Sequence, residues 1–114
     1  MENHKILVLY TTIGNEEAAE ELIRHLLAEK LIACGVSWPV RSQYHWKEKT
    51  VTEGEYAVIM KSSLRHRERL ETIAEKRHPY ETPALLFSET EVNVGYFEWV
   101  EEETQNNDQP ENEL

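Results

Sequence analysis

One group of residues combines aromatic rings with imidazole and carboxylate side chains, the types that hold small ligands or ions. Its members lie in three stretches of the chain: Tyr44, His45 and Trp46; His78, Tyr80 and Glu81; and Trp99. Tyrosine and tryptophan suit places where one end of the side chain is apolar and the other polar, which favours an interface or core cluster. The alternative is a pocket for a small ligand or ion, because such pockets combine rings with a few polar groups.

Other metal-binding and catalytic patterns are scarce. The five histidines include no pair at the i, i+4 spacing, and a single cysteine cannot supply a multi-cysteine zinc site. Cys34 alternates with Ile32 and Val36, which favours a buried core thiol. The chain has no Gly-x-Ser-x-Gly motif and no glycine-rich phosphate loop. We therefore expect no catalytic residues and no enzymatic activity.

Length and charge exclude several classes of protein. The 114 residues fit one domain, and 22 acidic against 12 basic residues give a formal net charge of −10. This balance argues against a general nucleic-acid binder and against docking on an anionic membrane. The apolar run at residues 6–10 is too short for a signal peptide or a membrane span. We expect a cytoplasmic protein without nucleic-acid or membrane partners.

The charge is unevenly distributed along the chain. From Glu101 onward, the sequence EEETQNNDQPENEL holds six acids, no bases and one apolar residue. Such a segment buries too little apolar surface to offset the conformational entropy that it would lose on ordering. The sequence therefore predicts a folded domain over residues 1–102 and a disordered acidic tail over 103–114. The opposite bias lies at 61–77, where six bases favour a solvated helix face, with an anion-binding face as the alternative.

Hydrophobic periodicity predicts the elements that would position these residues. Helical spacing predicts helices over 16–30 and 64–77, the second ended by His78-Pro79, and a short helix from Asn93. Apolar and alternating runs predict four strands and a hairpin turn, at 5–12, 32–46, 55–61 and 84–88 with the turn at 47–50. The order β-α-β-β-α-β plus a C-terminal helix is the ferredoxin-like α+β arrangement, with both long helices on one face of an antiparallel sheet.

Three of these strands are apolar on both of their faces. The runs at 6–10, 56–60 and 84–87 carry apolar residues at odd and even positions alike. Two helices cover one face of a sheet, and the other would expose an apolar patch too large for a soluble monomer. We infer a closed homo-oligomer in which the sheets pack together. The aromatic group would then form a pocket between subunits.

Several motifs resemble those of the CutA divalent-cation tolerance proteins. HPYETP at 78–83 resembles the HPYE-x-P signature of that family, and AEKLIAC at 28–34 resembles the entry into its second strand. YHW at 44–46 and NVGYFEW at 93–99 resemble its Tyr-x-Trp and Asn-x-x-Tyr-x-x-Trp motifs. The resemblance covers about residues 5–100, and Glu48 stands where the family often has a turn glycine.

This resemblance implies a ferredoxin-like fold assembled as a tight homotrimer and a cytoplasmic role in tolerance of divalent metals. Some members bind copper through a cysteine that ends the first strand and two adjacent histidines before the Pro-Tyr pair. The corresponding positions here are Tyr10, Arg77 and His78, so His78 is the remaining candidate ligand. A phenol and one imidazole are a poor copper set, and Arg77 adds positive charge.

We therefore expect a non-enzymatic homotrimer that acts in the response to divalent metal ions such as copper and binds metal weakly at most. No cofactor is expected beyond such a metal ion. The alternative is a trimeric sensor that resembles PII-type signalling proteins and binds a small anionic effector between subunits, which the basic stretch at 61–77 would favour.

Overall fold

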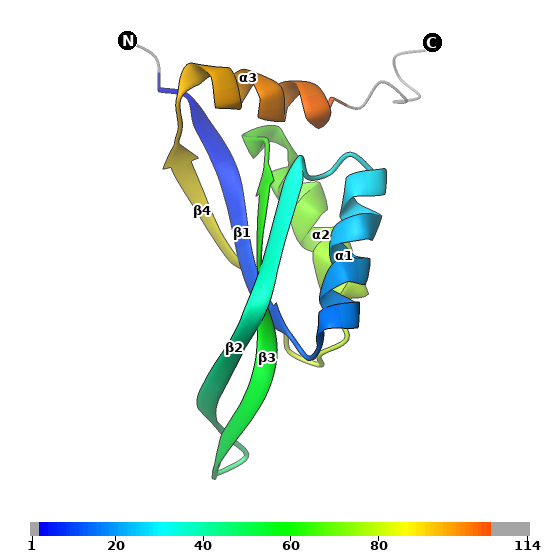
Figure 1. Ribbon diagram of the computed structural model, residues 1–114, viewed down its shortest axis with the longest axis vertical. Helices are drawn as coiled ribbons and strands as arrows, with labels where there is room; N and C mark the ends of the chain where they lie inside the picture. The colour runs from blue at the N-terminus through cyan, green and yellow to red at the C-terminus, as the bar shows by residue number, and fades with distance from the viewer. Residues whose placement is uncertain (1–2, 106–114) are drawn as a thin grey trace.

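The computed structural model describes residues 3–105 and has one four-stranded antiparallel sheet, in the order β2-β3-β1-β4. The strands are β1 (Lys5–Ile13), β2 (Cys34–Trp46), β3 (Lys49–Ser62) and β4 (Leu86–Glu91). The helices are α1 (Glu16–Ala28), α2 (Arg67–Arg77) and α3 (Val94–Glu103), and a short 3₁₀ turn, η1 (Leu64–His66), precedes α2. The predicted ferredoxin-like fold is confirmed (Figure 1).

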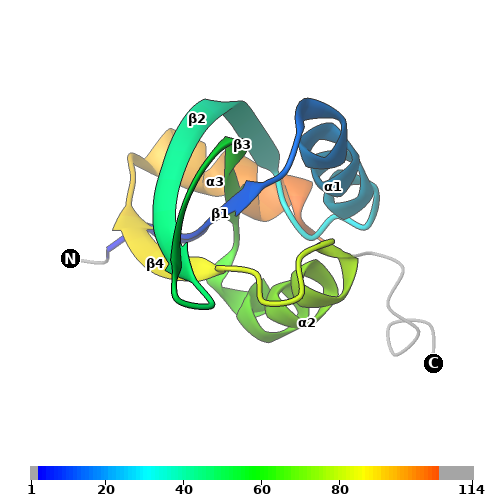
Figure 2. The same ribbon diagram turned by 90° about the horizontal axis from the view of Figure 1, so that it is seen from below.

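Helices α1 and α2 lie on the same side of the sheet, as Figure 2 shows. Asn15 caps the N-terminus of helix α1, and its side chain accepts a hydrogen bond from the Ala18 N–H at 2.8 Å. It ends at Ala28, earlier than predicted, because Lys30 adopts a left-handed backbone with φ of 58°. Between the two helices and the sheet lies the core, which includes Leu7, Leu9, Leu22, Leu26, Met60 and Leu70.

The hairpin of β2 and β3 is longer than the sequence predicted. Strand β3 begins at Lys49 rather than at 55, and the turn has only two residues, Lys47 and Glu48, with φ of 50° and 70°. The polar residues that begin β3 pair with β2 instead of following an apolar pattern. As a result the hairpin extends beyond the rest of the sheet as a two-stranded arm, at the bottom of Figure 1.

The fourth strand is displaced along the chain from its predicted position. The expected span was 84–88, but β4 runs from Leu86 to Glu91. Its polar second half pairs with the start of β1, where Lys5 faces Glu91 and Ile6 faces Thr90. Pairing with a neighbouring strand, rather than apolar content, sets the end of this strand.

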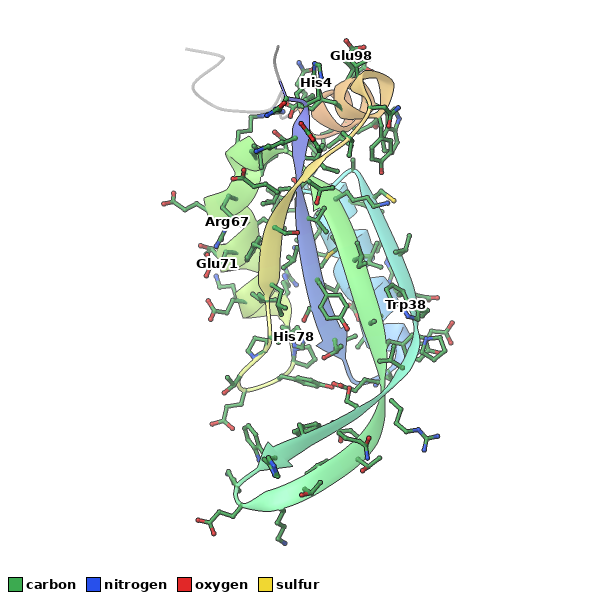
Figure 3. The ribbon with its side chains drawn as sticks, turned by 90° about the vertical axis from the view of Figure 1, so that its left-hand side faces the viewer. His4, Trp38, Arg67, Glu71, His78 and Glu98 are labelled. Atoms are coloured by element: carbon green, nitrogen blue, oxygen red, sulfur yellow. The ribbon has the colours of Figure 1, made fainter. Side chains whose placement is uncertain are left out.

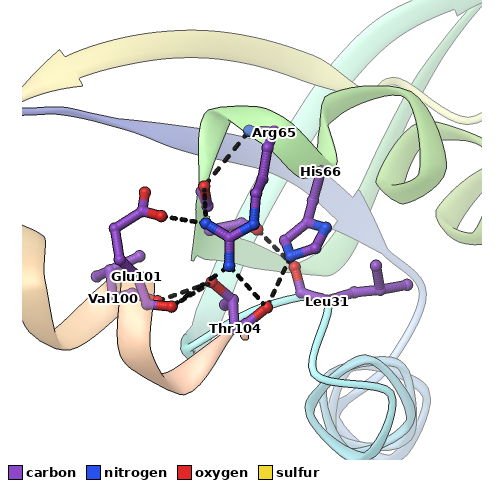
Figure 4. Close-up of polar contacts among 8 residues, drawn as sticks. Leu31, Arg65, His66, Val100, Glu101 and Thr104 are labelled. Atoms are coloured by element: carbon purple, nitrogen blue, oxygen red, sulfur yellow. Dashed lines mark hydrogen bonds and ion pairs between the residues drawn. The ribbon is translucent and has the colours of Figure 1, made fainter. Parts of the chain in front are cut away.

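Helix α3 crosses the end of the molecule opposite the hairpin arm and ends in a polar cluster (Figures 1 and 4). Thr104 is fully buried, and its carbonyl accepts from Arg65 Nη2 at 3.2 Å and from His66 Nε2 at 2.8 Å. Arg65 also pairs with Glu101. The segment predicted as a tail from 103 thus begins with helical Glu103 and buried Thr104, and its residues 106–114 lie outside the described part of the chain.

Beyond the end that α3 crosses, one face of the sheet has no helix over it, as Figure 3 shows. The alternation along the strands and their register place apolar side chains of all four strands on this face, namely Val8, Tyr10, Val36, Trp38, Ala57, Ile59 and Leu86. Val36, Trp38 and Leu86 are 41%, 40% and 55% exposed. We call these residues the open face. The uncovered apolar surface that the sequence predicted is therefore present in the single chain.

Candidate functional site

A groove of about 500 Å³ lies where the hairpin arm curls over the loop that follows α2. The arm contributes Tyr44, Trp46, Glu53 and Glu55, and the loop contributes Tyr80 and Glu81. Two features bring the arm and the loop together. The first is the length of the hairpin. The second is the end of α2 before His78-Pro79, where proline disfavours further helix.

The strand alternation explains which side chains face the groove. Along β2, Tyr44 and Trp46 share one face, which is that of Ser42. In the register of the hairpin Ser42 lies opposite Glu53, so the acidic residues of β3 lie beside the hydroxyl and aromatic residues of β2. The hairpin therefore places rings and carboxylates on one surface.

Hydroxyl groups bind the two carboxylates of β3. Glu55 is only 5% exposed, and its carboxylate accepts from Ser42 Oγ at 2.5 Å and from the Tyr80 hydroxyl. Glu53 Oε1 accepts from the Tyr44 hydroxyl at 2.6 Å. Each of these carboxylates thus has a donor, yet every donor is neutral, so the negative charge of the pair is dispersed and not cancelled.

Both tyrosines of this network hold their protons firmly. The hydrogen bond to Glu53 raises the pKa of Tyr44 to about 12. Burial, followed by the hydrogen bond to Glu55, raises the pKa of Tyr80 above its ordinary value. Near neutral pH the two phenols therefore act as hydrogen-bond donors, and neither is a nucleophile or an anionic ligand.

His78, the predicted metal ligand, uses both ring nitrogens within the chain. Its Nε2 lies 2.8 Å from the carbonyl oxygen of Thr12 and donates to it, while Nδ1 accepts from the Tyr80 N–H at 3.1 Å. Burial lowers the pKa of His78, although the hydrogen bond to Thr12 acts in the opposite direction. The arrangement fits a neutral imidazole that locks the loop, and a metal ion would have to displace one of the two contacts.

Tyr10 and Arg77, the other two residues aligned with the copper ligands, are not arranged as metal ligands. Tyr10 is on the open face, between Ile59 and Leu86, and Arg77 is the exposed last residue of α2. Within residues 3–105, no three His, Cys, Asp or Glu side chains are arranged to hold a metal ion. Cys34 is partly buried and has no disulfide partner.

Four of the six residues predicted to form a pocket line the groove within a single chain: Tyr44, Trp46, Tyr80 and Glu81. His45 lies between Tyr44 and Trp46 on β2, so alternation turns it to the other face of the arm. Trp99 belongs to α3 at the far end of the molecule, where its ring stacks on Tyr96 with centroids 5.7 Å apart.

Comparison with known proteins identifies the family. The family model of the CutA1 divalent ion tolerance protein matches residues 7–103, almost the whole of the described chain. The chain belongs to this family. The resemblance that the sequence motifs indicated is thereby confirmed.

Relatives of known structure and name agree with this membership. A divalent-cation tolerance protein CutA of Thermotoga maritima is 39% identical over 85% of this chain and 97% of its own. The crystal structure of CutA1 from Pyrococcus horikoshii has a TM-score of 0.85 at 33% identity, over 88% of this chain and 99% of that chain. A protein described as PII-like CutA, from a Nostoc species, has a TM-score of 0.81 at 31% identity, over 87% and 97%.

Sequence reasoning missed several residues that line the groove, among them Ser42, Glu53 and Glu55. The two acids lie before or at the start of the strand predicted over 55–61, so their partners across the hairpin were not assigned. Their i, i+2 spacing was the available signal, because this spacing puts two carboxylates on one face of a strand.

No helix among residues 3–105 is both long enough and apolar enough to cross a membrane.

Proposed function

We propose that this CutA1-family chain acts as a homotrimer in the cellular response to divalent metal ions, copper among them, and that it does so without catalysis. The family match over residues 7–103 carries the functional part of the proposal. The relative from Thermotoga maritima is named a divalent-cation tolerance protein. We place the protein in the cytoplasm, where its single unpaired cysteine, Cys34, suits a reducing compartment.

The open face supports the assembly. Its apolar residues come from all four strands, and α1 and α2 are both engaged on the opposite side of the sheet. A closed ring of copies would bury this surface without leaving an open end for further growth. Sedimentation-velocity measurements should give one species with three times the mass of the chain.

Direct metal binding should be weak, with His78 as the candidate ligand. Both of its ring nitrogens are already bonded inside the chain, so binding must break one of these contacts. A calorimetric titration with copper should show weak binding that decreases further in His78→Ala. Tight stoichiometric binding that survives in His78→Ala would require a different ligand set.

The response to metal is tested in cells that lack their own CutA. Expression of this chain should restore growth at raised copper concentration. An assembly-defective variant of the open face, such as Trp38→Glu, should not restore it if the trimer is the active form. Failure of the unaltered chain, at equal expression, would contradict the proposed function.

The PII-like sensor is the second candidate, favoured by the description of the Nostoc relative. The local charges oppose an anionic effector at the groove, which is lined by Glu53, Glu55 and Glu81. In the basic stretch, Arg65, Arg67 and Arg69 already pair with Glu101, Glu71 and Glu29. Titration with adenine nucleotides separates the two candidates, because only the sensor should bind them.

A further inference from the structure

We propose that the groove beneath the hairpin arm binds a small organic ammonium ion, a compound that carries a positive charge next to an apolar surface. The inference goes beyond the role in metal tolerance, because it uses no metal ligand. It rests on the charge, the aromatic lining and the size of the groove.

The charge of the groove is negative and is not balanced by a base. Glu53, Glu55 and Glu81 line it, and no lysine, arginine or histidine of residues 3–105 is among its lining residues. Within the same described range, none of the three glutamates forms an ion pair. The partners of Glu53 and Glu55 are neutral hydroxyls. A cation that entered the groove would be attracted by this charge, while an anion would be repelled.

The aromatic lining favours a cation with an organic surface. Tyr44, Trp46 and Tyr80 line the groove together with the glutamates, and the face of an aromatic ring attracts positive charge. One such contact already exists in the chain, because Lys47 Nζ lies 5.6 Å from the centroid of the Trp46 ring. An ammonium group of the protein thus lies over a ring of the groove, and a ligand would make the same type of contact.

The size of the groove separates an organic cation from a metal ion. Its volume of about 500 Å³ falls in the range of small-molecule pockets. A bare metal ion fills a much smaller space and needs several converging ligands, a cluster that residues 3–105 do not contain. Ser42 and the phenols of Tyr44 and Tyr80 are occupied as donors to carboxylates, so ring faces and negative charge remain for the ligand.

Choline and its uncharged isostere 3,3-dimethylbutan-1-ol provide the test, by calorimetric titration of the full-length protein. The two probes have the same shape and differ in charge. Choline should bind at least about tenfold more tightly than the isostere, as expected where carboxylates and ring faces act together on one cation. Trp46→Leu and Glu53→Gln should each weaken choline binding about fivefold or more.

A matched variant on α3 controls for surface effects. Glu98 lies on α3 at the end of the molecule away from the arm, as labelled in Figure 3. Glu98→Gln should leave choline affinity unchanged. The groove side chains of the arm lie on the same side of the sheet as the open face, so circular dichroism and sedimentation of each sample must first show that fold and assembly are retained.

Three outcomes would overturn the proposal. Equal affinity for choline and the isostere would mean that the groove accepts apolar molecules without regard to charge. An absence of choline binding by the folded protein would mean that the groove is closed or not a site. Equal losses in Glu53→Gln and Glu98→Gln would mean that the overall negative charge, and not the groove, attracts the cation.

Discussion

At the scale of single residues, His78 illustrates how a candidate ligand can be a structural side chain. Its ring connects the carbonyl of Thr12 on β1 with the N–H of Tyr80 in the loop. These bonds fix one neutral tautomer, with the proton on Nε2. Tyr80 is thereby held where its hydroxyl reaches Glu55, so the imidazole positions one wall of the groove.

The lowered pKa of His78 predicts a loss of stability on acidification. As the pH falls through about 6.5, the unfolded chain takes up a proton at His78 before the folded chain does, so protonation favours unfolding. Urea unfolding at fixed protein concentration should show this loss between about pH 7 and about pH 5. His78→Gln cannot titrate and should show a smaller loss over the same interval. Parallel pH curves for the two proteins would contradict the prediction.

At the scale of elements, the close approach of α1 to β2 depends on Gly35. A Cβ atom at this position would lie 2.8 Å from Cγ2 and 2.9 Å from Cγ1 of Ile23, closer than real contacts allow. The helix therefore packs directly on the strand backbone at this point, which sets the separation of the helical layer from the sheet.

Gly35→Ala should lower the free energy of unfolding by about 1–3 kcal/mol, because the added methyl group overpacks this contact. Ile23→Ala removes the atoms that clash, so the double variant should lose less than the sum of the two single losses. The control is Gly54→Ala in β3, where a Cβ atom meets nothing within 4 Å. Urea unfolding measures all four. An additive double variant would show that the contact is not the cause.

The turn of the hairpin arm holds two non-glycine residues in the left-handed region, Lys47 and Glu48. Glycine adopts this conformation without steric penalty, so Glu48→Gly should raise the free energy of unfolding by about 0.5–1 kcal/mol. Lys49→Gly, at the first residue of β3, serves as the control and should lower it. Melting temperatures at equal protein concentration check both changes. A lower melting temperature of Glu48→Gly would show that the glutamate side chain has its own favourable contact.

The same elements show how far prediction from the sequence reaches. Local patterns predicted α1 from its helical spacing and β1 from its apolar run, because these patterns depend on residues near in the chain. The groove depends on the register of the hairpin, which a two-residue turn fixes, so Glu53 and Glu55 stayed unassigned. Trp99 was grouped with the pocket from its residue type and its predicted place near the end of an element. Helix α3 holds it away from the groove of its own chain, and its part in a pocket between subunits stays a prediction.

At the scale of the whole molecule, the single chain has one sheet face covered by helices and one left open. A change that keeps the chain folded but charges the open face should therefore disturb only the assembly. Trp38 is suited to this test, since it lies on the edge strand β2, pairs in register with Ala57 and is 40% exposed in the single chain.

Trp38→Glu should shift the sedimentation of the protein from a trimer towards smaller species or aggregates, because burial of an unpaired carboxylate opposes association. Leu27→Glu is the matched control: Leu27 has nearly the same exposure, 42%, but lies on α1 away from the open face. It should sediment as the unaltered protein does. A trimer in Trp38→Glu as stable as the original would place the subunit contact elsewhere.

The strand order also has a consequence for the kinetics of folding. Strands β2 and β3 are joined by two residues, so their pairing can start next to the turn, at Trp46 and Lys49. Such local hairpin formation is fast. Strand β4 pairs with β1, so the last strand must find the first across nearly the whole chain. Such long-range pairing is slow, because the chain loses conformational entropy before the contacts between the two strands form. The hairpin arm that carries the groove should therefore form early in refolding, and the pairing of β4 with β1 should form last.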